Sequence, residues 1–145
     1  MTQFQTNPPP SFRIVAIMAV VWMAFGCMSY LMHVRMGPEA VATLPQGQQQ
    51  FMAMMPGWLY ALFAVATWSG LIGAVLMLLR KRLAVPFLLV SWIAAAAQMV
   101  GSYMVLPGLE LLGGPRALIM PVIIVALGII FWRYAMRGAA KGWLV

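Results

Sequence analysis

The chain has 145 residues, of which 64% are hydrophobic and 8% are charged, and its mean hydropathy is +0.94. Soluble domains are about 45 to 50% apolar and about 25% charged, so this composition excludes a water-soluble fold. The length fits one domain, and almost no soluble mass remains once membrane-spanning segments are subtracted. Any function therefore lies in or beside a membrane.

The net charge of +7 would fit a nucleic-acid-binding surface if the basic residues were clustered. The nine Lys and Arg residues instead stand at the ends of apolar runs, where such residues anchor helices and attract anionic lipid headgroups. We therefore expect these charges to meet a lipid bilayer, and we expect no nucleic-acid partner.

In chain order, spanning helices are expected at about residues 14–34, 56–79, 83–106 and 116–136. Each approaches the length of about 20 residues that a helix needs to cross a bilayer, and continuous apolar runs favour helices over barrel strands. A cleaved signal is disfavoured for the first segment because bulky Phe25 stands where a small residue is expected. The predicted fold is an all-α membrane protein, one domain over 1–145, forming a four-transmembrane-helix antiparallel bundle.

The distribution of Lys and Arg predicts the orientation of this bundle, because these residues are enriched in cytoplasmic loops. One side would hold seven of them, and the other side would hold two, Arg35 and Arg116. The seven are Arg13, Arg80, Lys81, Arg82, Arg133, Arg137 and Lys141. We therefore expect a multi-pass protein of the bacterial inner membrane with both termini in the cytoplasm.

Two connections carry structural information. Arg80, Lys81 and Arg82 are topology anchors and form the whole connection between the second and third helices, which must then be an antiparallel hairpin. The outer loop 35–55 contains Gly37-Pro38-Glu39, which is typical of a helix start, and later mixes polar residues with methionines. We expect this loop to lie on the outer membrane surface with an interfacial helix.

Polar residues inside the membrane are the first candidates for function, but no charged residue lies at depth. The deepest strongly polar side chain is Gln98, with Ser91 seven residues before it and Ser102 four residues after it on the same helix face. These three side chains either line a pocket for a small solute or form hydrogen bonds between helices, each worth about 1 kcal/mol. The structural interpretation is the more common one.

Small residues recur at spacings that let helix backbones approach closely. The pairs are Ser69 with Gly73, Gly70 with Ala74, and Ala97 with Gly101. They predict tight contact between the second and third helices and would also suit self-association.

Metal binding, cofactor binding and catalysis find little support. His33 is the only histidine and Cys27 is the only cysteine. Met52, Met54 and Met55 lie close together in the sequence, and their thioether groups are of the kind that binds Cu(I). No nucleophile stands in a recognisable activating arrangement. We expect no metal, no cofactor and no enzymatic activity.

A family resemblance rests on residues between Ala42 and Gln98. The matching residues are Ala42-Thr43-Leu44-Pro45, Pro56-Gly57-Trp58, Phe63, Gly70-Leu71-Ile72-Gly73, Leu78-Leu79-Arg80-Lys81-Arg82, Ala84-Val85-Pro86, Ser91 and Gln98. In these residues the chain resembles an uncharacterised family of small four-span bacterial membrane proteins, some of which carry the label of sugar transporter. The resemblance implies an inner-membrane location and a shared fold.

These observations favour a non-enzymatic accessory, regulatory or self-associating protein, with a homo-oligomer or a partner membrane protein expected. The alternative is a carrier for a small neutral solute such as a sugar, with Ser91, Gln98 and Ser102 along its path. A membrane enzyme that acts on lipid is the third possibility.

Overall fold

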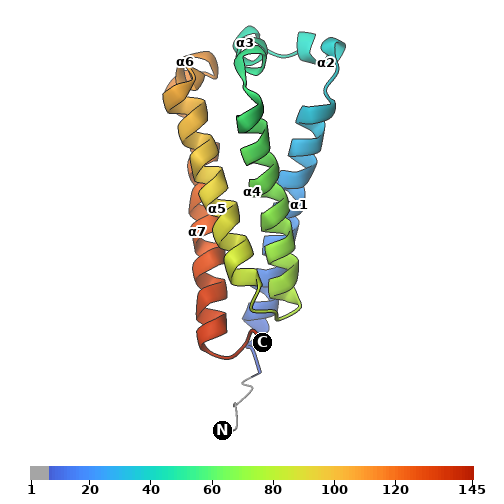
Figure 1. Cartoon of the computed structure of the whole chain (residues 1–145), viewed down its shortest axis with the longest axis vertical. Helices are drawn as coiled ribbons and strands as arrows, with labels where there is room; N and C mark the ends of the chain where they lie inside the picture. Colours follow the sequence, from blue (N-terminus) through green and yellow to red (C-terminus); the bar gives the residue numbers. More distant parts are fainter. Residues whose placement is uncertain (1–6) are drawn as a thin grey trace.

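The computed structural model describes residues 7–145, which form a bundle of long helices with short helices at one end (Figure 1). The long helices are α1 (Pro10–Arg35), α4 (Gly57–Leu78), α5 (Ala84–Val100) and α7 (Ile119–Ala140). A π-helix, η1 (Gly101–Val105), continues α5, and a 3-10 helix, η2 (Gly114–Leu118), precedes α7. The short helices are α2 (Pro38–Ala42), α3 (Gln46–Met54) and α6 (Gly108–Leu111).

Within residues 7–145, four helical segments are long and apolar enough to cross a membrane, with lengths of 26, 22, 22 and 27 residues. The predicted all-α membrane bundle is thereby confirmed. The first helix begins at Pro10, earlier than expected, because proline at the first helical position loses no hydrogen bond. The loop expected over 35–55 contains both α2 and α3.

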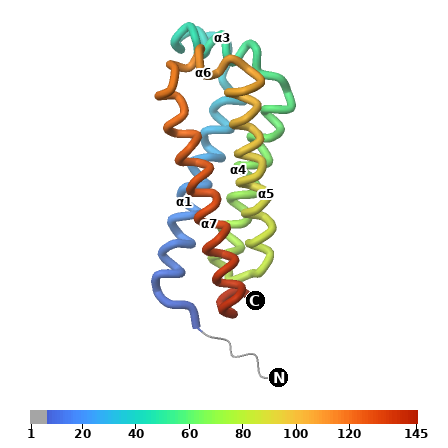
Figure 2. The backbone as a smooth tube through the Cα atoms, turned by 90° about the vertical axis from the view of Figure 1, so that its left-hand side faces the viewer, coloured from blue at the N-terminus to red at the C-terminus, as the bar shows by residue number. Residues whose placement is uncertain are grey.

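The two ends of the bundle differ in character. In Figures 1 and 2, α1 begins and α7 ends beside the turn between α4 and α5. We call this the basic end, because Arg80, Lys81 and Arg82 form that turn. The opposite end carries α2, α3 and α6, and we call it the loop end.

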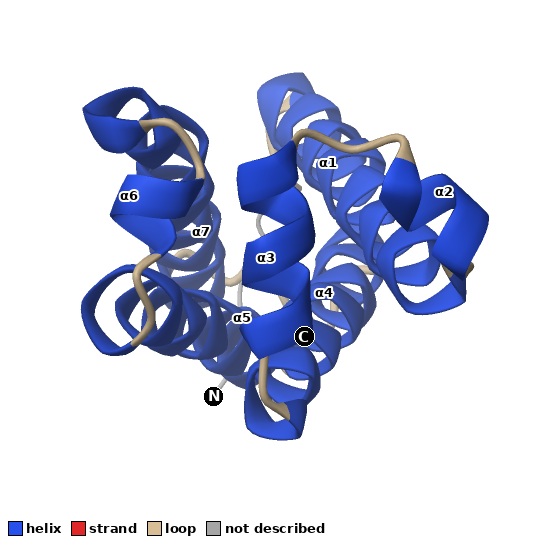
Figure 3. Ribbon diagram, turned by 90° about the horizontal axis from the view of Figure 1, so that it is seen from above, coloured by secondary structure: helices blue, strands red, loops and turns tan. Residues whose placement is uncertain are grey.

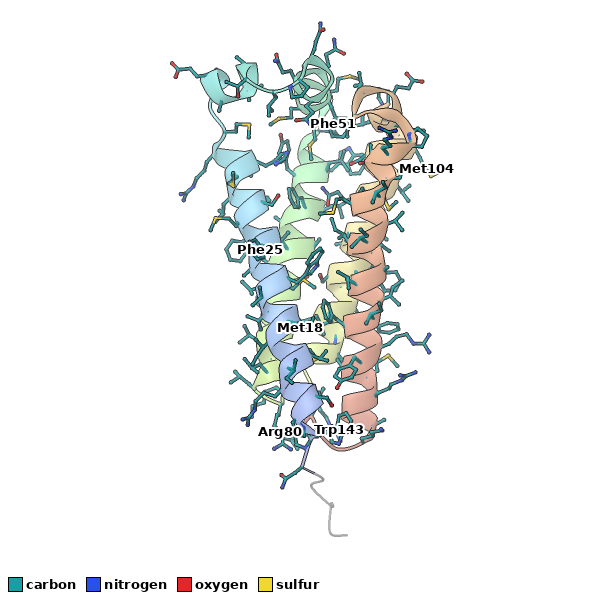
Figure 4. All side chains as sticks on the ribbon, turned by 180° about the vertical axis from the view of Figure 1, so that it is seen from behind. Met18, Phe25, Phe51, Arg80, Met104 and Trp143 are labelled. Atoms are coloured by element: carbon teal, nitrogen blue, oxygen red, sulfur yellow. The ribbon has the colours of Figure 1, made fainter. Side chains whose placement is uncertain are left out.

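The long helices form an open ring. α1 packs against α4, α4 against α5, and α5 against α7, whereas α1 and α7 have no extended contact with each other. Figure 3, viewed along the bundle, shows this order, with α3 lying over the loop end. Figure 4 shows α1 and α7 close together at the basic end and diverging toward the loop end.

Close approach of α4 to both neighbours depends on its glycines. A Cβ atom at Gly70 would lie 2.6 Å from Met23 Sδ on α1 and 2.6 Å from Ser91 Oγ on α5. A Cβ atom at Gly73 would lie 3.0 Å from the backbone nitrogen of Leu88. Apolar helices in lipid gain from such contacts because dispersion, and not the hydrophobic effect, holds them together.

Residues 143–145, which we call the closing segment, fill the basic end of the bundle. Leu144 is fully buried and joins a core cluster that includes Phe12 and Met77. Arg80 Nε donates a hydrogen bond of 2.9 Å to the carbonyl oxygen of Trp143. The ring of Trp143 also contacts that of Phe12 edge to face, with centroids 5.6 Å apart. The closing segment therefore joins α7 to α1 and to the α4–α5 turn.

Candidate functional site

A cavity of about 440 Å³, which we call the main cavity, lies between the four long helices. Most of its wall is apolar or aromatic, and it receives residues from every long helix. They include Trp22, Met23, Phe25 and Ser29 of α1, Phe63, Ala66 and Thr67 of α4, Ser91, Trp92, Ala95 and Gln98 of α5, and Met120, Ile124 and Gly128 of α7. Figure 4 shows α1 and α7 diverging toward the loop end. Two of the most exposed residues that line the main cavity, Phe25 and Met120, come from these two helices.

A second cavity of about 230 Å³, the loop-end cavity, adjoins the main cavity. Phe63, Ala95, Gln98 and Ile124 line both. The loop-end cavity adds more polar side chains, among them His33, Ser102 and Tyr103. Gln98 therefore stands at the junction of the two cavities.

Gln98 is a half-buried side chain, and its amide makes no hydrogen bond with any residue in the range 7–145. The amide is not fully enclosed, so the free energy cost of leaving it without a partner lies below the value of about 1 to 3 kcal/mol for a fully buried amide. The interhelical hydrogen bond that would make Gln98 structural is not formed. Its position instead places the amide on the wall of both cavities.

Ser91 and Ser102, which the sequence groups with Gln98, have different surroundings. Ser91 is buried, and its hydroxyl donates a hydrogen bond of 2.6 Å to the carbonyl oxygen of Ala66, linking α5 to α4. Ser102 is buried within η1 and lines the loop-end cavity. Gln98 thus shares the main cavity with Ser91, whose hydroxyl hydrogen is donated to Ala66, and the loop-end cavity with Ser102.

The π-helix η1 positions this polar wall. Its wider turn ends where the N–H of Leu106 bonds to the carbonyl oxygen of Gly101 at 3.0 Å. Tyr103 donates to the carbonyl oxygen of Ala117 at 3.1 Å and so ties η1 to η2. Short π-helical segments are frequent at functional sites. The π-helix η1 was not predicted from the sequence.

Helix α3 covers the loop-end cavity. Phe51 of α3 is buried and lines that cavity. Two glycines allow the close contact: a Cβ atom at Gly47 would collide with the carbonyl oxygen of Leu111, and one at Gly108 would lie 3.2 Å from the Phe51 ring. α3 is therefore held against α6, where it covers the loop-end cavity.

The small residues that the sequence assigns to helix contacts mostly serve within the chain. Gly70, Gly73, Ala74 and Gly101 are buried. Ser69 is partly buried, and its hydroxyl bonds to the carbonyl oxygen of Val65 in its own helix. Ala97, by contrast, is exposed.

One close contact was missed by sequence reasoning. A Cβ atom at Gly128 of α7 would lie 2.8 Å from Trp92 Cβ of α5, so this glycine lets α7 approach α5. The rings of Trp92 and Trp132 lie 5.9 Å apart, and both indole N–H groups are buried without an acceptor among the described residues. A lone glycine in the apolar stretch of α7 was the only signal for this contact.

His33 and Cys27 have surroundings that are set by neighbouring helices. The His33 ring contacts the Phe63 ring edge to face, with centroids 5.9 Å apart. Cys27 is buried, and its thiol donates to the carbonyl oxygen of Thr67 at 3.3 Å. Within residues 7–145, no group of three or more His, Cys, Asp or Glu residues is arranged to hold a metal ion.

Comparison with models of known protein families, with curated proteins and with solved structures finds no match to this chain. The resemblance to four-span bacterial proteins therefore stays a prediction.

Proposed function

We propose that this chain is a non-enzymatic, multi-pass protein of the bacterial inner membrane that binds a small, uncharged and mainly apolar molecule in its main cavity. The observation that carries the proposal is the amide of Gln98, which stands without a partner among residues 7–145 on the wall of a mainly apolar cavity. A bound molecule that hydrogen-bonds to this amide would remove the cost of leaving it unpaired.

Binding of a small molecule has more support than an accessory role through helix contacts. The small residues that would suit self-association, such as Gly70 and Gly73, are already covered by α1 and α5. Their presence is explained within one chain and requires no second copy.

A sugar carrier has less support than a binder of apolar molecules. A sugar would exchange many hydrogen bonds with water for the few that the polar groups of the main cavity offer. The hydroxyl hydrogens of Ser91 and Thr67, which line that cavity, are already donated to backbone carbonyl oxygens. Leu144 also fills the basic end of the bundle, where a solute crossing along the helices would have to pass.

The proposal places both termini in the cytoplasm, as the Lys and Arg distribution favours. Reporter fusions at Ala42, on the loop end, and after Val145 test this orientation. We expect an external signal at Ala42 and a cytoplasmic signal after Val145. The reverse pattern would overturn the orientation and leave the binding proposal intact.

Ligand binding can be tested with 11-bromoundecanol, a neutral single-tailed probe whose bromine quenches tryptophan fluorescence at short range. The protein in nanodiscs of phosphatidylcholine should show saturable quenching, because Trp22 and Trp92 line the main cavity. Ala95→Leu, which adds volume where the two cavities meet, should abolish the saturable part. The matched variant Ala61→Leu, on an exposed face of α4, should retain it.

Quenching that rises linearly with probe concentration in the unmodified protein would refute the proposal. So would saturable quenching that is equal in the Ala95→Leu and Ala61→Leu variants. Circular dichroism of each variant verifies that the helices are formed.

A further inference from the structure

We propose that the molecule bound in the main cavity is a membrane quinone or a compound of the same chemistry: an uncharged planar head with carbonyl oxygens and one hydrocarbon tail. This inference rests on the proposed binding function and names its ligand class. It follows from the charge, the shape and the opening of the main cavity.

Charge restricts the head of the ligand. No Asp, Glu, Lys or Arg lines the main cavity among the described residues. A carboxylate or phosphate head would lose its hydration at this depth without gaining a cation, which costs several kcal/mol or more. Fatty acids and phospholipids are therefore excluded as occupants by their headgroups, and a neutral head remains.

The aromatic side chains favour a planar head. Trp22 on α1, Phe63 on α4 and Trp92 on α5 all line the same cavity, and Phe25, which is 70% exposed, lies at its edge. Aromatic rings pair best in offset-stacked or edge-to-face arrangements, and a flat conjugated ring can meet several of them in these ways. A flexible alcohol or glyceride head gains less from such walls.

Gln98 supplies the polar contact. Its side-chain amide carries two N–H donors and has no partner in the range 7–145, so a quinone carbonyl oxygen can accept from it. The hydroxyl groups on that stretch of α5 and α4 are occupied, because Ser91 bonds to Ala66 and Thr67 bonds to Phe63. The indole N–H of Trp92, which also lines the main cavity and has no acceptor among the described residues, is a second donor for a ligand carbonyl oxygen.

The size and position of the main cavity fit a ligand whose hydrocarbon tail extends out of it. A volume of about 440 Å³ lies near the lower end of the range for small-molecule sites, so it holds a compact head and not a whole long-chain lipid. Because α1 and α7 diverge beside the cavity, the tail can extend between them into the bilayer (Figure 4). The ligand then enters sideways from the lipid phase.

Photolabelling of the full-length protein in phosphatidylcholine nanodiscs tests the proposal, with an azido-substituted ubiquinone as label and decylubiquinone as competitor. We expect saturable labelling of peptides from α1, α5 and α7 that decylubiquinone prevents. Gln98→Leu should weaken decylubiquinone binding about five-fold, the loss expected for one hydrogen bond. Trp22→Leu should also weaken it.

Gln50→Leu is the matched control, because Gln50 is exposed on α3 and lies outside both cavities. Its affinity for decylubiquinone should equal that of the unmodified protein. Equal affinity in the Gln98→Leu variant would overturn the quinone assignment.

The outcome with 11-bromoundecanol separates this inference from the proposed function. Saturable binding of bromoundecanol together with decylubiquinone binding at least ten-fold weaker would overturn the ligand class and leave the binding function standing. Absence of saturable binding for both probes would overturn both proposals. Tight binding of decylubiquinone that Gln98→Leu weakens would support both.

Discussion

The backbone N–H of Val145 donates a hydrogen bond of 2.7 Å to the carbonyl oxygen of Arg80, which stands in the left-handed region with φ of 61°. The N–H of Arg82 in turn donates to the carbonyl oxygen of Val145 at 3.0 Å. These two bonds fix the closing segment to the α4–α5 turn. Among the long helices, α7 packs extensively only against α5, so this attachment is its second fixed point.

Leu144→Ala should therefore lower the stability of the whole bundle. The side chain is 0% exposed and lies among the core residues at the basic end. We expect a loss of about 2 to 5 kcal/mol, the range for removing a buried leucine side chain. Thermal unfolding in detergent measures this loss. Val145→Ala, at a side chain that is 50% exposed, should cost far less, and equal losses in the two variants would contradict the burial of Leu144.

Gly73→Ala should also destabilise the bundle, because the new Cβ atom would lie 2.9 Å from Leu88 Cγ and 3.0 Å from the Leu88 backbone nitrogen. Overpacking of this kind costs about 1 to 3 kcal/mol. Gly26→Ala is the matched control on α1, since its Cβ atom would meet Thr67 Cγ2 at an ordinary 3.4 Å. We expect that variant to be as stable as the unmodified protein or slightly more stable, because alanine favours helix. The same unfolding measurement compares both variants.

Gln98→Leu should not lower stability although it should weaken ligand binding. The amide of Gln98 has no partner in the range 7–145, so its replacement removes an unpaired polar group from apolar surroundings. We expect stability in the absence of ligand to rise by up to about 1 kcal/mol. Ser91→Ala should instead lose about 0.6 kcal/mol with its hydrogen bond to Ala66. A loss in Gln98→Leu as large as that in Ser91→Ala would mean that Gln98 is structural.

Phe51→Ala should release α3 from the loop end, because Phe51 is the one buried residue of that helix. Hydrogen exchange of the α3 amides should become faster, while exchange in α4 and α5 stays unchanged. Met54→Ala, at a side chain that is 50% exposed on the same helix, is the control and should leave exchange as it was. Unchanged exchange in Phe51→Ala would show that α3 is held by other contacts.

The spanning helices were predictable because length and hydropathy are local properties of the sequence. The close approach of α4 and α5 was predictable in the same way, since a connection as short as residues 79–83 leaves no other neighbour. Gln98 was also noticeable, because a strongly polar side chain stands out in an apolar run. These features need no knowledge of which helix faces which.

The cavity was not predictable, because α1 is apolar on every face. Its buried residues Ala16 and Ala19 alternate with exposed apolar residues such as Ile17 and Met18, so periodicity does not reveal the inward face. The spread of α1 from α7 is a tertiary property that leaves no trace in either helix alone.

The burial of the closing segment was equally unpredictable from the sequence. Gly142 has φ of 74°, the conformation that ends many helices and turns the chain back, and this glycine was its only local signal. Whether Leu144 then enters the bundle depends on the space that Phe12 and Met77 leave there.

Leu144 is buried at the basic end of the bundle, whereas α1 and α7 diverge toward the loop end (Figure 4). Under the proposed function, a ligand would enter and leave between α1 and α7. The protein would then store its ligand or pass it to a neighbour in the plane of the membrane. Movement of a solute from one face of the membrane to the other would first require Leu144 to leave its place.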